Sequence, residues 1–154
     1  MNRSGKGSAK SGRVSKFILK NNQIEIPSTL DYLSQVDEFI ESKLRKLGID
    51  EDQIADIAIS VTEAVTNAVV HGNKNDLNKK VTISLKADSS RVEVRVEDEG
   101  AGFDPDSIRS PISEENLLKE NGRGVFILKS LMDKVDFSPG FKKGTRIKMV
   151  KFLT

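Results

Sequence analysis

The stretch between Asp50 and Gly72 constrains the fold more than any other part of this chain. Asp50 is suited to cap the start of a helix, and Gln53 follows it in capping-box register. Gly72, directly after His71, is suited to end that helix. At about 100° per residue, one set of apolar side chains points in a single direction, to within roughly 60°. The set is Ile54, Ile57, Ala58, Val61, Val65 and Ala68. The spacing predicts a long helix with one face packed against a sheet.

Alternating apolar and polar side chains predict the strands of that sheet. One strand is expected before Pro27, a hairpin at Val81–Ala87 and Arg91–Glu97, and two more strands near Val135–Ser138 and Thr145–Phe152. The hairpin strands are separated by three polar residues, which suit a tight turn.

Two further helices complete the pattern. Ser28 is a candidate N-cap for a helix that ends at Gly48 and carries an apolar stripe from Leu33 to Leu47. Helical spacing returns at Val125, after a long segment without periodicity. This order of elements predicts an α+β fold, a two-layer α/β sandwich whose mostly antiparallel mixed sheet is covered on one face by helices.

Charge is divided unequally along the chain. Residues 1–16 hold five basic side chains and no acidic one, whereas residues 17–154 hold 20 basic and 23 acidic residues. The net charge of +2 therefore hides a balance of −3 in the second segment. Glycine, serine and lysine dominate the first segment, which predicts a disordered basic tail ahead of one domain at 17–154. The acidic domain argues against direct nucleic-acid binding.

Length and composition exclude several other classes of protein. A chain of 154 residues has room for one core. It has no cysteine, so disulfides and thiolate metal sites are excluded, and its single histidine excludes a multi-histidine metal centre. No apolar run approaches the roughly 20 residues that cross a bilayer, and the start resembles no secretory leader. We therefore expect a cytoplasmic protein without a membrane partner.

Two polar residues stand out on the predicted long helix. Glu63 and Asn67 are four residues apart on the side opposite the sheet-facing stripe. Ile59 and Val70 share that side, so it is not a simple solvated surface. A carboxylate and an amide among apolar neighbours are typical of groups beneath a ligand, although the spacing also fits an ordinary polar pair on a helix surface.

Three glycine-containing turns are the other candidate segments. They are Asp98-Glu99-Gly100-Ala101-Gly102 after a strand, Gly122-Arg123-Gly124 before a helix, and Gly144-Thr145 at the start of the last strand. An aspartate at a strand end can accept a hydrogen bond from an amino-bearing ring, and free amides at a helix start attract phosphate. Each turn alone also fits an ordinary loop, and none matches a P-loop, a Rossmann fingerprint or a calcium loop.

Taken in order, these segments resemble the motifs of the GHKL (Bergerat-fold) ATPases. The run from Glu63 to Asn67 is similar to the N box of that family, and the turns are similar to its two glycine boxes and its final Gly-Thr. The resemblance covers about residues 17–152. Within the family, the string E-A-V-T-N-A-V-V-H-G, which ends at Gly72, is most similar to the bacterial anti-sigma factor serine/threonine-protein kinases.

The resemblance implies an ATP site beneath a lid at about Phe103–Asn121. It implies that Glu63 is the general base, that Asn67 offers a side-chain oxygen to Mg²⁺, and that Asp98 binds the adenine amino group. The other nucleotide-binding residues that it implies are Gly100, Gly102, Gly122, Arg123, Gly124 and Thr145. For His71 we expect a structural role at the helix end.

The resemblance also implies a function. The chain would be an ATP-dependent serine/threonine protein kinase that acts as an anti-sigma factor, phosphorylates an anti-anti-sigma (STAS-type) partner, sequesters a sigma factor and forms a homodimer. Two alternatives stay open: a nucleotide-binding regulatory module that switches partners without phosphoryl transfer, and the detached catalytic domain of a histidine-kinase-like system. The presence of Glu63 favours the kinase, because a non-catalytic relative could lose this residue.

Overall fold

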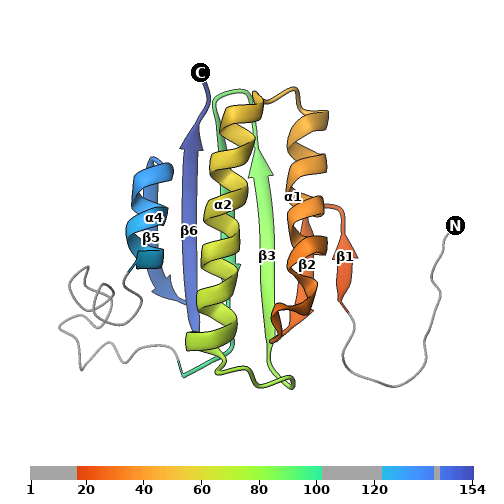
Figure 1. Cartoon of the computed structure of the whole chain (residues 1–154), viewed down its shortest axis with the longest axis vertical. Coiled ribbons are helices and arrows are strands. Elements are labelled where there is room, and N and C mark those ends of the chain that lie inside the picture. Colours follow the sequence, from red (N-terminus) through yellow and green to blue (C-terminus); the bar gives the residue numbers. More distant parts are fainter. Residues whose placement is uncertain (1–16, 102–122, 141–142) are drawn as a thin grey trace, which may run out of the picture.

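A computed structural model describes residues 17–101, 123–140 and 143–154. Six strands form one sheet in the spatial order β1-β2-β3-β4-β6-β5. They are β1 (Ile18–Lys20), β2 (Gln23–Pro27), β3 (Lys80–Ala87), β4 (Arg91–Glu97), β5 (Lys134–Pro139) and β6 (Thr145–Phe152). Three helices cover one face of the sheet, with α2 in the middle (Figure 1). They are α1 (Leu33–Lys46), α2 (Glu51–Asn67) and α4 (Arg123–Leu131). The predicted two-layer α/β sandwich is confirmed, while the expected tail and lid lie outside the described residues.

The sheet is more regular than the mostly antiparallel mixed sheet that we expected. All five pairings between the described strands are antiparallel. β4 and β5 run in the same direction, because each is antiparallel to β6. Since β6 lies between them, these two strands form no parallel ladder.

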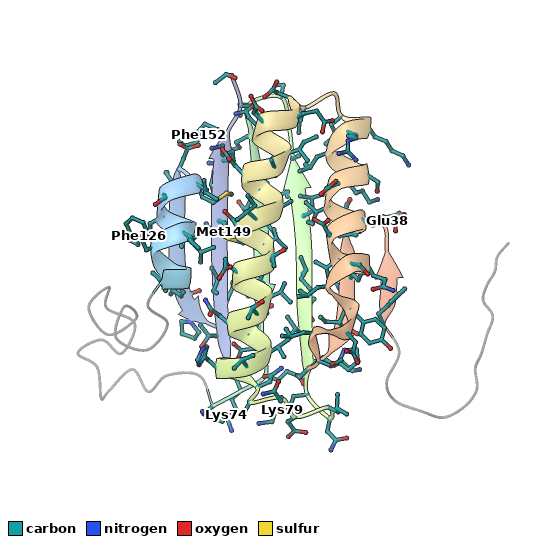
Figure 2. The ribbon with its side chains drawn as sticks, viewed as in Figure 1. Glu38, Lys74, Lys79, Phe126, Met149 and Phe152 are labelled. Carbon is teal, nitrogen blue, oxygen red and sulfur yellow. The ribbon has the colours of Figure 1, made fainter. Side chains whose placement is uncertain are left out.

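The central helix buries the face that its spacing predicts. All six residues of the predicted stripe are buried, and Ile57 and Val65 are fully inaccessible. All of them except Ala58 pack in one core with strand residues such as Ile83, Val94 and Met149, and Figure 2 shows Met149 in the layer behind the helices. Burial of each large aliphatic side chain contributes about 1.5–3 kcal/mol, so this face fixes the helix on the sheet.

The ends of α2 are capped as the sequence indicates, with one addition. The Asp50 carboxylate accepts hydrogen bonds from the amides of Asp52 and Gln53. The Gln53 side chain also makes a distant bond, in which Nε2 donates to the carbonyl of Phe152 at 3.0 Å. That bond ties the start of α2 to the end of β6.

Ser28 does not cap α1, contrary to our expectation. Its side chain is buried and belongs to another network, in which Oγ donates to the Lys79 carbonyl (2.6 Å) and accepts from Nδ2 of Asn73 (2.8 Å). Thr29 instead caps a short 3₁₀ turn, η1 (Leu30–Tyr32), which leads into α1. A hydroxyl that binds distant backbone is not free to cap the next helix.

The segment before Pro27 is a hairpin rather than the single strand that we expected. β1 and β2 pair around a two-residue turn at Asn21-Asn22, with Lys20 opposite Gln23. At the other end of α1, Gly48 follows the helix with φ of 75°, as a helix-ending glycine should. Leu47 is 59% exposed, because it lies just beyond the last helical residue.

The long helix also corrects one expectation drawn from composition. From Glu51 to Gly72, α2 and a final π-helical turn, η2 (Ala68–Gly72), make a helix that is long and apolar enough to cross a membrane by length and composition alone. Half of its most apolar stretch of 18 residues is buried inside the domain. Packing against the sheet and the neighbouring helices accounts for this apolar character.

Candidate functional site

Several of the candidate residues that the structure describes lie at one end of the sandwich, the lower end in Figure 1. There α2 passes into η2, and β4 leads into Asp98. Because β6 is the antiparallel neighbour of β4, its start at Thr145 lies beside the end of β4. The first turn of α4 is its lower end in Figure 1 and lies higher up, beside α2.

Asp98 is a buried and hydrogen-bonded polar group of the site. Its side chain is buried, and Oδ1 accepts hydrogen bonds from the amides of Gly100 (2.9 Å) and Thr145 (3.1 Å). The amide of Asp98 in turn donates to the carbonyl of Thr145, which extends the β4–β6 ladder by one residue. Both side-chain bonds use the same oxygen, so among the described residues Oδ2 is left for a ligand with a hydrogen to donate.

The environment of Asp98 disfavours its charged form. Burial raises the pKa of the Asp98 carboxyl above its ordinary value of 3.8, and the nearby carboxylate of Glu97 adds to this rise. The amides of Gly100 and Thr145 and the charge of Lys79 oppose the rise without cancelling it. A buried carboxylate that is short of donors gains from a ligand that supplies one.

Three glycines allow the backbone to approach Asp98 closely. A Cβ at Gly72 would overlap the Asp98 carboxylate, and a Cβ at Gly100 would overlap the carbonyl of Gly72. At Gly144, φ is 84° and a Cβ would overlap the carbonyl of Asp98. Gly72 does end the helix, but it needs no left-handed conformation; the contact with Asp98 is what demands glycine there.

Glu63 and Asn67 form a second group with the first turn of α4. A Cβ added at Gly124 would lie 3.1 Å from Oε1 of Glu63 and 3.5 Å from Nδ2 of Asn67. Both side chains therefore point toward the start of α4, on the side of α2 that the spacing predicts. The positive end of the helix dipole faces the same space and favours a negatively charged group.

Asn67 shows that a polar partner is missing from this group. Its Nδ2 is buried and has no hydrogen-bond partner among the described residues. Such a group costs about 1–3 kcal/mol if it stays unpaired, so it indicates a place for a ligand. Rotation of the amide presents Oδ1 instead, and this oxygen suits a hard cation such as Mg²⁺. Within the described ranges no three histidine, aspartate or glutamate side chains gather as a metal site.

The group around Asp98 and the group of Glu63 and Asn67 lie at two levels along the axis of the long helix. Glu63 and Gly72 are nine residues apart on the same helix, which corresponds to about 14 Å along the helix axis. Asp98 lies against Gly72 at one end, and Gly124 lies against Glu63 at the other. The site is therefore elongated, with a carboxylate for a ring at one end and a helix start for anionic groups at the other.

The other residues singled out in the sequence have different outcomes in the structure. Gly102 and Gly122 lie outside the described residues, and so does the side chain of Arg123. His71 is exposed in the last turn of η2. One residue was missed entirely: Asn73, directly after Gly72, is 1% exposed. Only its place directly after a helix end, where asparagine often binds backbone, could have marked it.

Comparisons with known proteins identify the family of this chain. The family described as "Histidine kinase-like ATPase domain" matches residues 26–151. The serine-protein kinase RsbW of Bacillus subtilis (strain 168) is 32% identical over 145 residues, which cover 88% of this chain and 89% of RsbW.

Two solved structures share the fold. The RsbU and RsbW domains of Rv1364c from Mycobacterium tuberculosis align with a TM-score of 0.57 and 23% identity, over 85% of this chain and 32% of that chain. The catalytic domain of the histidine kinase ThkA aligns with a TM-score of 0.51 and 20% identity, over 86% of this chain and 98% of that domain. These similarities establish the architecture in which the site is built.

Proposed function

Because this chain belongs to the histidine kinase-like ATPase (GHKL) family, and within it is similar to the serine-protein kinase RsbW over most of its length, we propose that it is an ATP-dependent serine/threonine protein kinase that acts as an anti-sigma factor. Its proposed substrate is a STAS-type anti-anti-sigma protein, and its proposed second partner is a sigma factor. We further propose that it works in the cytoplasm as a homodimer and contacts neither nucleic acid nor a membrane.

The observation that carries this proposal is the pairing of Glu63 and Asn67 against the start of α4. A carboxylate and an unpartnered amide face a helix N-terminus there, which is an arrangement suited to the reacting end of a nucleotide. The adenine amino group would donate to Asp98, and Gly100 and Thr145 would form the wall beside the base. Gly102 would let the chain approach the base, and Gly122, Arg123 and Gly124 would complete the phosphate end.

In the proposed reaction the protein positions groups and moves one proton. The Glu63 carboxylate accepts the proton of a serine or threonine hydroxyl while the hydroxyl oxygen forms a bond to the γ-phosphorus. The bond from that phosphorus to the β–γ bridging oxygen breaks, and ADP leaves. Mg²⁺, held in part by the Asn67 oxygen, would neutralise phosphate charge. The Asn67 amide fixes the phosphates so that the γ-phosphorus faces Glu63.

Calorimetric titration with ATP-Mg²⁺ and ADP tests the nucleotide site directly. The proposal predicts metal-dependent binding that weakens at least about tenfold in Asn67→Ala, because a charge-assisted contact is lost. Gln35→Ala is the matched control, since it removes a helix amide from α1, outside the site. A folded wild-type protein that binds no nucleotide would overturn the proposal.

Transfer of labelled phosphate separates the kinase from the regulatory module. Partners captured from extract of the native cell, with ATP or ADP present, would be incubated with the protein and γ-labelled ATP. The proposal predicts label on a serine or threonine of one captured protein. Nucleotide-dependent capture without any label would favour a module that switches partners and would contradict the kinase assignment.

A further inference from the structure

Asn73 is the most completely bonded buried side chain next to the site, yet the proposed reaction does not use it. Its Nδ2 donates to Oγ of Ser28 (2.8 Å) and to the carbonyl of Lys80 (3.0 Å). Its Oδ1 accepts from the amide of Glu99 (2.8 Å), and its own amide donates to the carbonyl of Ala68. Both side-chain donors and one acceptor position are therefore occupied.

These partners belong to segments that are far apart in the sequence. Ser28 follows β2, Lys80 begins β3, and Glu99 follows β4. Two further bonds close the network, from the Lys80 amide to Oε1 of Glu99 (2.9 Å) and from the Ser28 hydroxyl to the Lys79 carbonyl (2.6 Å). One amide side chain thus joins three strand ends to the last turn of η2.

The loop that carries Asn73 is held in an unusual conformation. The two residues after it, Lys74 and Asn75, have φ of 52° and 58°, which is rare for side chains other than glycine. The Asn75 amide donates to the carbonyl of Val69, and the Asp76 amide donates to the carbonyl of Asn73. In Figure 2, Lys74 and Lys79 mark this loop below the end of α2. The loop pins Asn73 against the helix end, so the side chain has little freedom to follow a moving partner.

The bond to Glu99 bears directly on Asp98. The Glu99 amide belongs to the peptide group that joins Asp98 to Glu99, so this hydrogen bond sets the orientation of that peptide. The next amide, of Gly100, is the one that donates to Oδ1 of Asp98. Gly100 also lies so close to the Gly72 carbonyl that no Cβ would fit between them, so the turn cannot shift toward the helix.

We propose that Asn73 is a positioning residue that sets the selectivity of the site for adenine, by holding the Asp98-Glu99-Gly100 turn at a fixed distance from the helix end. The inference rests on the proposed nucleotide site. Without the Asn73 bond, the turn can rotate away from Gly72, and Asp98 then meets the amino group of the base less accurately. Contacts to the phosphates depend on Asn67 and α4, and they remain in place.

The test compares adenosine and inosine diphosphates, which differ at the position that Asp98 would recognise. Calorimetry should show that the wild-type protein prefers ADP over IDP by at least about tenfold, because the oxo group of IDP gives Asp98 no donor. In Asn73→Ala that preference should fall by about five- to tenfold, mainly through weaker ADP binding, since one positioned hydrogen bond is worth this much. Asn73→Asp can still accept a hydrogen bond from the Glu99 amide but cannot donate one to the Lys80 carbonyl. Its preference for ADP should therefore lie between those of the wild-type protein and Asn73→Ala.

Ser28→Ala is the matched control. It removes a buried partner of the same network, on the side away from Asp98, and leaves the bond between Asn73 and Glu99 intact. We expect it to lower thermal stability while it keeps the preference for ADP. Amide hydrogen exchange of ligand-free protein should accelerate at Glu99 and Gly100 in Asn73→Ala, less so in Asn73→Asp, and stay slow in Ser28→Ala.

The outcomes separate this inference from the proposed function. If the folded wild-type protein binds neither nucleotide, both fail. If it prefers ADP and a folded Asn73 variant keeps the full preference, the inference fails and the proposed function stands. Should Asn73→Ala not fold, Asn73→Asp decides the question. An equal loss of preference in Ser28→Ala would also overturn it, because general weakening of the network would then explain the effect.

Discussion

Asp98 must stay ionised in a buried position in order to bind an amino group. Burial raises its pKa above 3.8, so the carboxylate takes up a proton at a higher pH than an exposed aspartate does. ADP affinity should be constant where the carboxylate is ionised and should weaken about tenfold per pH unit once the pH falls below that raised pKa. Calorimetry between neutral pH and the onset of acid unfolding measures this profile.

Asp98→Asn distinguishes the titration of the Asp98 carboxyl from the titration of the nucleotide itself. The amide keeps an oxygen that accepts from the Gly100 and Thr145 amides, but it carries no titrating proton. We expect weaker ADP binding at neutral pH and a smaller loss on acidification, since only the phosphate groups and the base still titrate. Parallel profiles for the two proteins would mean that Asp98 does not contact the base.

Glu63 is the residue on which the proposed chemistry depends. Glu63→Gln keeps the size of the side chain and removes the ability to accept a proton, so phosphoryl transfer should fall by about 10²- to 10⁴-fold. ATP affinity should change little, because Asn67 and Asp98 remain. Asp52→Asn, an exposed carboxylate on the same helix, should leave both quantities unchanged. Normal transfer by Glu63→Gln would show that another group acts as the base.

Gly124, at the start of α4, lowers the stability of the helix but leaves space for the proposed nucleotide. Alanine in place of a helical glycine stabilises a helix by up to about 1 kcal/mol. Gly124→Ala, however, would put a methyl group 3.1 Å from Oε1 of Glu63 and crowd Asn67. We expect a thermal midpoint that is unchanged or higher, together with at least about tenfold weaker ATP binding or transfer, because the methyl group fills space meant for phosphate.

The same helix provides the control for Gly124→Ala. Ser130 is exposed on α4, and its hydroxyl donates only to the carbonyl of Phe126 in the turn before it. Ser130→Ala makes a smaller gain in helix propensity without approaching Glu63, so binding and transfer should both stay normal. If Gly124→Ala is also normal, the start of α4 does not contact the nucleotide.

Periodicity predicted the elements, but it could not predict how their ends are bonded. The spacing of the stripe on α2 follows from helix geometry, so the burial of Ile57 and Val65 and the opposite placement of Glu63 could be predicted from the sequence. Ser28 could not, because its partners are Lys79 and Asn73. A hydroxyl near a helix start fits a cap until the distant partner is known.

Over the whole molecule, the order of the strands is the feature that local patterns leave undetermined. The hairpins β1–β2, β3–β4 and β5–β6 join neighbours in sequence, but β6 also pairs with β4 and β2 also pairs with β3. These long-range pairings bring Asp98 beside Thr145, and they place the end of β4 against the end of α2. Alternation could not predict that Asp98 and Thr145 belong to one site; that expectation came from the resemblance to a known family.

The division of charge leads to a prediction for the complete chain. Removal of residues 1–16 changes the net charge from +2 to −3 and leaves the proposed domain at 17–154. Its first described contact is the edge-to-face packing of Phe17 on Tyr32, with ring centroids 5.5 Å apart. We expect the shortened chain to keep its free energy of unfolding within about 0.5 kcal/mol, since the core lies in later elements, and to bind ADP with unchanged affinity.

Phe17→Ala in the shortened chain tests whether urea unfolding can detect a loss of stability at the N-terminal end of the described residues. The substitution removes the ring contact with Tyr32 and should destabilise the protein by about 1 kcal/mol or more, because an aromatic pair adds about 0.5–1.5 kcal/mol beyond its buried area. Urea unfolding of the complete chain, the shortened chain and the variant measures all three on one scale. If removal of residues 1–16 alone costs as much as Phe17→Ala, the basic segment is part of the folded domain, and the division of the chain at residue 16 is wrong.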